Sequence, residues 1–284
     1  MADEQEQQEG KAKGGSFKPD FATIGGLLLA FGSIVAGLIM EKGNIHDVAQ
    51  VTSALIVLGG TFGAVMVTTP LGTVVGAAKK FGSVFFGKQE SPRAAIEEII
   101  GYAAQARKDG IVSLEAQASA IADPFLNKAL SLAVDGVESA TIRDIMELEI
   151  QIMEEHIEAE ARVFEAAGGY APTIGIIGAV LGLIQVMKNL ADIDEVGRGI
   201  AVAFVATIYG VAAANIIFLP AAGKLKARGK EAIQVRELML EGVLAIANGV
   251  NQKLIRLKLE GYLGHKASAK KKGEAAAEAV AAEA

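Results

Sequence analysis

Two uncharged apolar stretches constrain this chain more than any other feature of its sequence. The first covers 166–187 and reads AAGGYAPTIGIIGAVLGLIQVM, and the second covers 199–223 and reads GIAVAFVATIYGVAAANIIFLPAAG. Neither contains Asp, Glu, Lys, Arg or His, and each exceeds the roughly 20 residues that cross a hydrocarbon core of about 30 Å. Since backbone groups at that depth must bond within their own segment, both are predicted to be helices. The polar link 188–198 makes them a hairpin.

Each of these helices carries one proline, Pro172 in the first and Pro220 in the second, at the same end of the hairpin. A proline has no N–H donor, so Pro172 frees the carbonyl of Gly168 and Pro220 that of Ile216. Prolines in membrane helices often do no more than bend them, and this remains the alternative interpretation.

A helical projection places mostly small residues on one face of each helix, which favours close helix contact. Thr207 is the polar exception. Its hydroxyl is predicted either to bond back to the carbonyl of Ala203 or to line a pathway for an ion between helices. The two projected faces consist of Pro172, Gly175, Ile176, Ala179 and Leu183, and of Ala203, Thr207, Gly210, Ala214, Phe218 and Ala221.

Two further uncharged stretches, 21–40 and 51–78, are also long enough to span a membrane, and Pro70 is predicted to kink the second. Lysines and arginines follow the second and fourth spans directly. Under the positive-inside rule both termini and residues 79–165 then lie in the cytoplasm. The sequence therefore predicts an all-α integral membrane protein with four transmembrane helices and a helical cytoplasmic domain between spans 2 and 3.

The remaining segments are polar. Residues 1–20 are predicted to be a flexible tail, 224–265 a cytoplasmic C-terminal helix, and 266–284 a low-complexity tail. Within 79–165, helical periodicity predicts four helices, the last of them running unbroken into the third span. Their predicted ranges are 92–109, 114–122, 124–135 and 140–165.

Composition excludes several classes of function. The net charge of −6 is small and segregated, which argues against nucleic-acid binding. There is no cysteine, and the three histidines lie far apart without metal-ligand spacing. The spans hold no His, Asp, Glu or Cys from which an intramembrane enzyme would be built. We therefore expect neither an enzyme nor a resident cofactor.

The stretch ARKDGIVSLE, from Ala106 to Glu115, combines a basic pair, a turn at a glycine and an acid. Arg107 ends one predicted helix, where a cation suits the helix dipole, and Ser113 is suited to cap the next. Capping alone explains these residue types.

Several separate motifs, in order, resemble the A subunit of the bacterial flagellar stator, the family that includes MotA and PomA. The resemblance covers about residues 17–263. The motifs are FATIGG (21–26), GGTFGAVMVTTPLG (59–72), RKDGIVSLE (107–115), APTIGIIGAVLGLI (171–184), ATIYGVAAANIIFLPAAGKL (206–225) and LMLEGVLAIANGVN (238–251).

The resemblance implies a homo-pentamer in the bacterial inner membrane around two copies of a single-span B subunit of the MotB or PomB type. Ion flow would drive rotation and torque on the rotor protein FliG. By the same resemblance Pro172, Pro220 and Thr207 match the ion pathway, and Arg107 and Glu115 match the residues that face the rotor. Because no span holds a carboxylate, the charge that a desolvated ion needs must come from another chain.

Ala179 bears on the coupling ion. Sodium-driven members of the family carry threonine seven residues after the third-span proline, where proton-driven members carry alanine. A methyl group supplies no ligand to sodium, so protons are expected, with sodium as the alternative because carbonyls freed by Pro172 also offer oxygens. Two other functions stay open: an energiser of outer-membrane transport of the ExbB/TolQ type, which has three spans, and a passive membrane scaffold.

Overall fold

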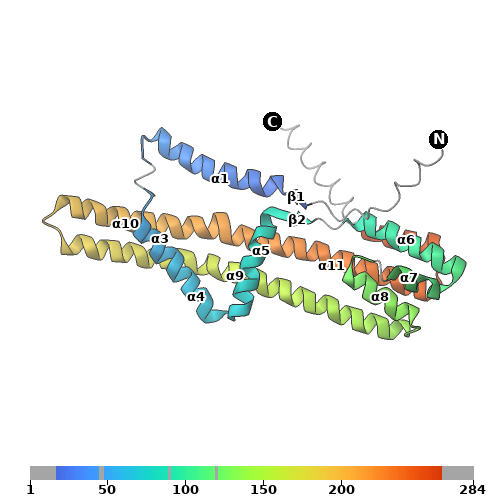
Figure 1. Cartoon of the computed structure of the whole chain (residues 1–284). Helices are drawn as coiled ribbons and strands as arrows, with labels where there is room; N and C mark the ends of the chain where they lie inside the picture. Colours follow the sequence, from blue (N-terminus) through green and yellow to red (C-terminus); the bar gives the residue numbers. More distant parts are fainter. Residues whose placement is uncertain (1–16, 45–47, 89–90, 119–120, 264–284) are drawn as a thin grey trace, which may run out of the picture. The chain divides into compact units, whose positions relative to one another are not determined.

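The computed structural model describes residues 17–44, 48–88, 91–118 and 121–263 (Figure 1). Within this part of the chain, four helices are long and apolar enough to cross a membrane. They are Phe21–Met40, Val51–Thr68, Ser139–Lys188 and Ile193–Ala247. The predicted all-α membrane fold with four spans is confirmed.

The described residues divide into two compact units, which we call the span unit (within 17–88 and 156–228) and the polar unit (within 91–155 and 229–263). The long helix α9 (Ser139–Lys188) and the run α10 (Ile193–Ala212), η3 (Ala213–Phe218) and α11 (Leu219–Ala247) contribute to both. The span unit also holds β1 (Phe17–Pro19), α1 (Phe21–Met40), α3 (Val51–Ala54), η1 (Leu55–Gly59), α4 (Gly60–Thr68), α5 (Leu71–Phe85) and β2 (Phe86–Lys88). The polar unit also holds α6 (Pro92–Asp109), η2 (Ile111–Leu114), α7 (Glu115–Ala118), α8 (Pro124–Val134) and a last helix at 252–263.

Short polar side chains begin several of these helices by accepting a bond from a free N–H of the first turn. Asp20 accepts from the N–H of Thr23, and Asp192 accepts from the second and third residues of α10. Asp123 and Ser91 cap α8 and α6, and in each case a proline follows at the first helical position. Proline suits that place because its missing N–H would have no partner there.

The polar unit has a continuous apolar core. α6, α8, the first part of α9, the last part of α11 and the helix 252–263 all contribute to it. Fully burying one such aliphatic side chain is worth about 1.5–3 kcal/mol, so this core is the main source of stability of the unit. Its most buried large side chains are Ile96, Ile99, Leu114, Leu126, Leu130, Ile142, Met146, Leu238, Ile255 and Leu259.

The second span is shorter than the predicted 51–78. It ends at Thr68, Thr69 is extended, and α5 begins as a separate helix at Leu71. The residue before a proline is driven out of the helical region by the proline ring, so Pro70 breaks the helix here rather than kinking it. α5 then packs on α9 through the stacked rings of Phe81 and Phe164, 5.7 Å apart.

Other boundaries also differ from those expected. Of the predicted flexible tail 1–20, residues 17–19 form β1, which pairs antiparallel with β2 (Figure 1), while 1–16 lie outside the described residues. The predicted helix 224–265 is interrupted after Ala247, where Gly249 adopts a positive φ of 64° that a side chain would strain. In place of a helix at 114–122 there is the short pair η2 and α7. The tail 266–284 lies outside the described residues.

Candidate functional site

The hairpin of the third and fourth spans is held by glycines that let the backbones of α9 and α10 touch. A Cβ added at any of them would lie closer than 3.0 Å to a backbone atom of the other helix, which real Cβ atoms essentially never do. Such a Cβ would lie 2.5 Å from the Ala171 oxygen if added at Gly210, 2.7 Å from the Gly199 oxygen if added at Gly182, and 2.9 Å from the Ala206 oxygen if added at Gly175. We call this contact the glycine seam, and it is the close approach that small residues allow in membranes.

The face of the third span that packs in the glycine seam differs from the predicted one. Gly175 lies in it as expected, but Ile176 and Leu183 are 58% and 51% exposed. Gly178 and Gly182 take their place, since both are buried against α10. On the fourth span the predicted face does pack: Ala203, Gly210, Ala214, Phe218 and Ala221 are all buried.

The two predicted prolines lie in different backbone settings. α9 continues through Pro172, which leaves the carbonyl of Gly168 without its usual donor. Pro220 lies two residues after the end of η3, a π-helical segment at whose end the N–H of Leu219 bonds to the carbonyl of Ala214, five residues back. Leu219 packs against Gly168, so the turn of α9 before Pro172 lies beside the end of the π-helical segment within the span unit. Such π turns are frequent at functional sites.

Thr207 lies on α10, half-buried, and its hydroxyl donates to the carbonyl of Ala203 at 3.1 Å. Of the two predicted states of this hydroxyl, the structure has the bond back to the preceding turn. Ala179 is also half-buried on α9, one turn beyond Gly175. Thr207 lies beside the seam, because its Cα would be 3.5 Å from a Cβ placed on Gly175.

A polar network between the second and fourth spans was missed by the sequence analysis. The hydroxyl of Tyr209 donates to the carbonyl of Val48 at 2.6 Å and accepts from the N–H of Gln50 at 3.2 Å. The fully buried Ser53 donates to the carbonyl of Val202 at 3.2 Å. A tyrosine inside an otherwise apolar span was the available signal, since a buried phenol requires a partner.

The described spans hold no acid, so the hairpin has no carboxylate of its own. No Asp, Glu, Lys, Arg or His lies within 21–40, 51–68, 166–187 or 199–223. Among the described residues there is also no cluster of three His, Cys, Asp or Glu that could hold a metal ion. The four spans themselves therefore offer a cation only hydroxyls and carbonyls, which are neutral ligands.

Arg107 and Glu115 lie in the polar unit and are both exposed. Arg107 is in the last turn of α6, and Glu115 opens α7 after the turn at Gly110. Neither has an ion-pair partner among the residues that the structure describes. Ser113 does not cap a helix as predicted: its hydroxyl donates to the carbonyl of Gly110 at 2.6 Å.

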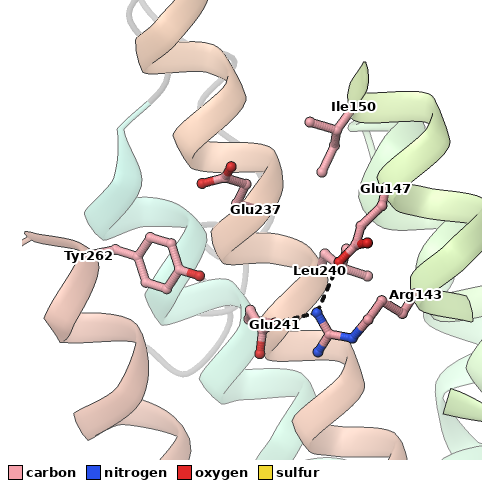
Figure 2. A pocket seen from close by; sticks show the side chains of 7 residues that line it. All are labelled: Arg143, Glu147, Ile150, Glu237, Leu240, Glu241 and Tyr262. Atoms are coloured by element: carbon pink, nitrogen blue, oxygen red, sulfur yellow. Dashed lines mark hydrogen bonds and ion pairs between the residues drawn. The ribbon is translucent and has the colours of Figure 1, made fainter. Parts of the chain in front are cut away.

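A hollow of about 330 Å³ lies in the polar unit between α9, α11 and the helix 252–263 (Figure 2). Arg143 lies 3.1 Å from Glu147 on its own helix and 2.8 Å from Glu241 on α11. Burial raises the pKa of Glu241, but hydrogen bonds from Lys258 and Arg143 outweigh it and hold that pKa below its usual value. The charges lining the hollow are therefore largely paired within the chain.

Two family profiles match the chain. The motility protein A N-terminal family matches residues 24–108, and the MotA/TolQ/ExbB proton channel family matches residues 117–238. Motility protein A of Bacillus subtilis (strain 168) is 37% identical over 248 residues, which cover 86% of this chain and 91% of that protein. Chemotaxis protein PomA of Vibrio alginolyticus is 34% identical, covering 86% of this chain and 95% of that protein.

Solved structures agree in fold as well as in sequence. The structure of MotAB from C. jejuni matches with a TM-score of 0.82 and 34% identity over 86% of this chain and 95% of that chain. The flagellar MotAB stator complex from Bacillus subtilis matches with a TM-score of 0.78 and 36% identity, covering 85% and 95%.

The four spans and the glycine seam define a multi-pass helical membrane protein, and the match over residues 117–238 assigns it to the proton channel family. The N-terminal match distinguishes it from the other branches of the proton channel family. The chain belongs to the motility protein A family.

Proposed function

We propose that this chain is the A subunit of an ion-driven flagellar stator, which converts a transmembrane ion gradient into torque together with a B subunit. The observation that carries the proposal is the α9–α10 hairpin. Its helices touch through glycines, Pro172 frees a carbonyl within α9, Pro220 lies close to a π-helical segment, and none of its residues from 166–187 or 199–223 is charged. Such a hairpin can move as a unit beside an ion but cannot hold that ion by itself.

The missing charge identifies the kind of partner. A desolvated cation in hydrocarbon needs an anionic ligand, and an intramembrane carboxylate is the usual one. The two related solved structures are of MotAB. A single-span B subunit of the MotB or PomB type, carrying one acid in its span, would complete the pathway beside Thr207 and Ala179.

For the coupling ion we propose protons. Ala179 presents a methyl group where a hydroxyl would add a ligand for sodium, and the hydroxyl of Thr207 is already bonded to Ala203. Sodium replaces its water shell with several oxygens, whereas a proton needs one titratable acid and a hydrogen-bonded path. Sodium remains the alternative, because the Gly168 carbonyl freed by Pro172 is also an oxygen ligand.

Torque would pass through the polar unit, in which Arg107 and Glu115 are exposed and suited to meet charges of the rotor protein FliG. We propose a pentamer of this chain in the bacterial inner membrane, with the polar unit and both termini in the cytoplasm. The lysines and arginines that follow the spans support this orientation.

The test uses a motile strain that lacks its own A and B subunits and expresses this chain with its B partner. Swimming speed should follow the proton gradient and ignore external sodium at fixed pH. Ala179→Thr should leave assembly intact and change the ion response, and Gly169→Ala, in open space on the same helix, is the matched control. Speed that rises and saturates with sodium would overturn the assignment of protons, and paralysis with a fully assembled complex would overturn the stator function.

A second test addresses the rotor contact. The double charge reversal Arg107→Glu with Glu115→Arg should impair swimming while the complex still co-purifies with its B subunit. Exposed ion pairs are each worth only about 0–1 kcal/mol, so single neutral changes should have smaller effects. Normal swimming of the double variant would leave helix capping as the whole role of these two residues.

A further inference from the structure

The first span makes few packing contacts with the rest of the chain along its length. α1 has no buried side chain, and nothing lies within 4 Å of a Cβ added at Gly25, Gly26, Gly32 or Gly37. The anchoring contacts lie at its N-terminal end. At its first end, β1 pairs with β2 in a register that places Phe17 opposite Lys88.

Asp20, the residue between β1 and α1, binds the fourth-span helix. One carboxylate oxygen, Oδ1, accepts from the N–H of Thr23 at 3.1 Å and caps α1. The other, Oδ2, lies 2.5 Å from Nζ of Lys224 and 2.9 Å from Nη2 of Arg228, both on α11. A single carboxylate thus joins the start of the first span to a helix more than 200 residues further along the chain.

These contacts are partly shielded from water, although the Lys224 side chain is 31% exposed. The Asp20 side chain is 18% exposed and that of Arg228 25%. The Nη1 atom of Arg228 is buried without a hydrogen bond of its own among the described residues, so this guanidinium is compensated through Asp20. Hydrogen bonds from Lys224 above all, and from Thr23 and Arg228, hold the pKa of Asp20 well below its usual value despite burial. The carboxylate is therefore ionised at any physiological pH.

The neighbouring lysine on α11 provides a contrast. Lys226 lies between Lys224 and Arg228 in sequence, but it pairs with Glu165 of α9 at 2.7 Å, and both side chains are more than 40% exposed. The same stretch of α11 therefore binds α1 through one set of cations and α9 through another.

We infer that Asp20 is a positioning residue, whose carboxylate fixes the first span to α11 so that the two helices move as one body. If the stator function proposed above holds, displacement of α11 beyond Pro220 would be carried to α1 through this contact. The anchoring itself is independent of that function.

Hydrogen exchange on the complete complex with its B subunit, in a lipid nanodisc, tests the anchoring directly. Asp20→Asn keeps a side chain that caps helices well but removes the charge. Because bonds to charged groups are strong, we expect exchange in the peptide 17–27 to become about tenfold faster. Arg228→Gln should have a smaller effect in the same direction, because Lys224 stays paired with Asp20, and adding it to Asp20→Asn should produce little further increase. Lys226→Gln, the matched control, should leave this peptide unchanged.

A conservative variant distinguishes a role of the Asp20 carboxylate in positioning α1 from a general requirement for aspartate at this position. Asp20→Glu, which restores the carboxylate, should return both the exchange rate and swimming toward the wild-type values. Wild-type exchange in Asp20→Asn, or effects of Asp20→Asn and Arg228→Gln that simply add, would overturn the inference. Fast exchange together with normal swimming would support the contact between α1 and α11 but refute its role in transmitting motion, and the proposed stator function would be unaffected. If Asp20→Asn fails to assemble, Arg228→Gln alone decides the question by the same readout.

Discussion

The glycine seam can be tested by adding one methyl group at a time. A Cβ at Gly210 would stand 2.5 Å from the carbonyl oxygen of Ala171, about 0.9 Å short of ordinary van der Waals contact. At Gly182 and Gly175 the nearest backbone oxygens are at 2.7 and 2.9 Å. Backbone of a packed helix cannot rotate away as a side chain can, so α9 and α10 must separate.

We expect each alanine substitution in the seam to cost about 1–3 kcal/mol, the usual penalty of overpacking, with Gly210→Ala the most costly and Gly175→Ala the least. At roughly 2–4 °C per kcal/mol, the melting temperature of the purified complex should fall by several degrees. Gly168→Ala gives a sharper comparison. Its added Cβ would meet Leu219 at 2.6 Å, but that neighbour is a flexible side chain, so this variant should cost less than Gly182→Ala.

Thermal unfolding of the complex, followed by light scattering, measures the series. Gly223→Ala, on the same continuous run of helix but with nothing within 4 Å of its added Cβ, is the control and should be neutral or stabilising. Equal melting temperatures for Gly210→Ala and Gly223→Ala would refute the close backbone contact. A larger loss from Gly168→Ala than from Gly182→Ala would refute the argument that backbone neighbours yield less than side chains.

Three other predictions concern an acid in the polar unit, a hydroxyl in the span unit and the orientation of the chain. Asp123 caps α8 and binds Arg236. Burial acts to raise the pKa of Asp123, but hydrogen bonds from Arg236 and from backbone N–H groups outweigh burial and hold that pKa below its usual value. The stabilisation that the ionised Asp123 contributes is therefore fully present above about pH 4 and is lost as the pH falls through the pKa of the folded state. In Asp123→Asn the free energy of unfolding should fall less steeply at acid pH, and an unchanged acid dependence would contradict this. Tyr209→Phe removes both hydrogen bonds of the Tyr209 hydroxyl and should lower stability by about 1 kcal/mol without preventing assembly. An unchanged melting temperature would show that these two hydrogen bonds contribute nothing to stability. A cysteine at Asp194 should react with an impermeant thiol reagent in intact cells and one at Lys108 should not; the reverse pattern would invert the proposed orientation.

The sequence determined the membrane architecture because length and polarity leave a spanning segment few choices. An uncharged run of 20 residues or more must satisfy its own backbone groups in hydrocarbon, and this predicted the first span as Phe21–Met40. Local chemistry also predicted the start of α6 at Pro92 and the unbroken run of α9 into the third span. Because the spans contain no acid, composition alone indicated that an ion pathway would need a charge from a partner chain.

The tertiary structure decided which faces meet. Helical periodicity placed Ile176 and Leu183 on the face of Pro172, but the packing of α9 against α10 selected the adjacent face with Gly178 and Gly182. Periodicity shows which residues share a face, whereas only the partner helix fixes which face is covered. For the same reason Asp20 appeared in the sequence as part of a tail, because its cations on α11 are more than 200 residues away and no local pattern connects them.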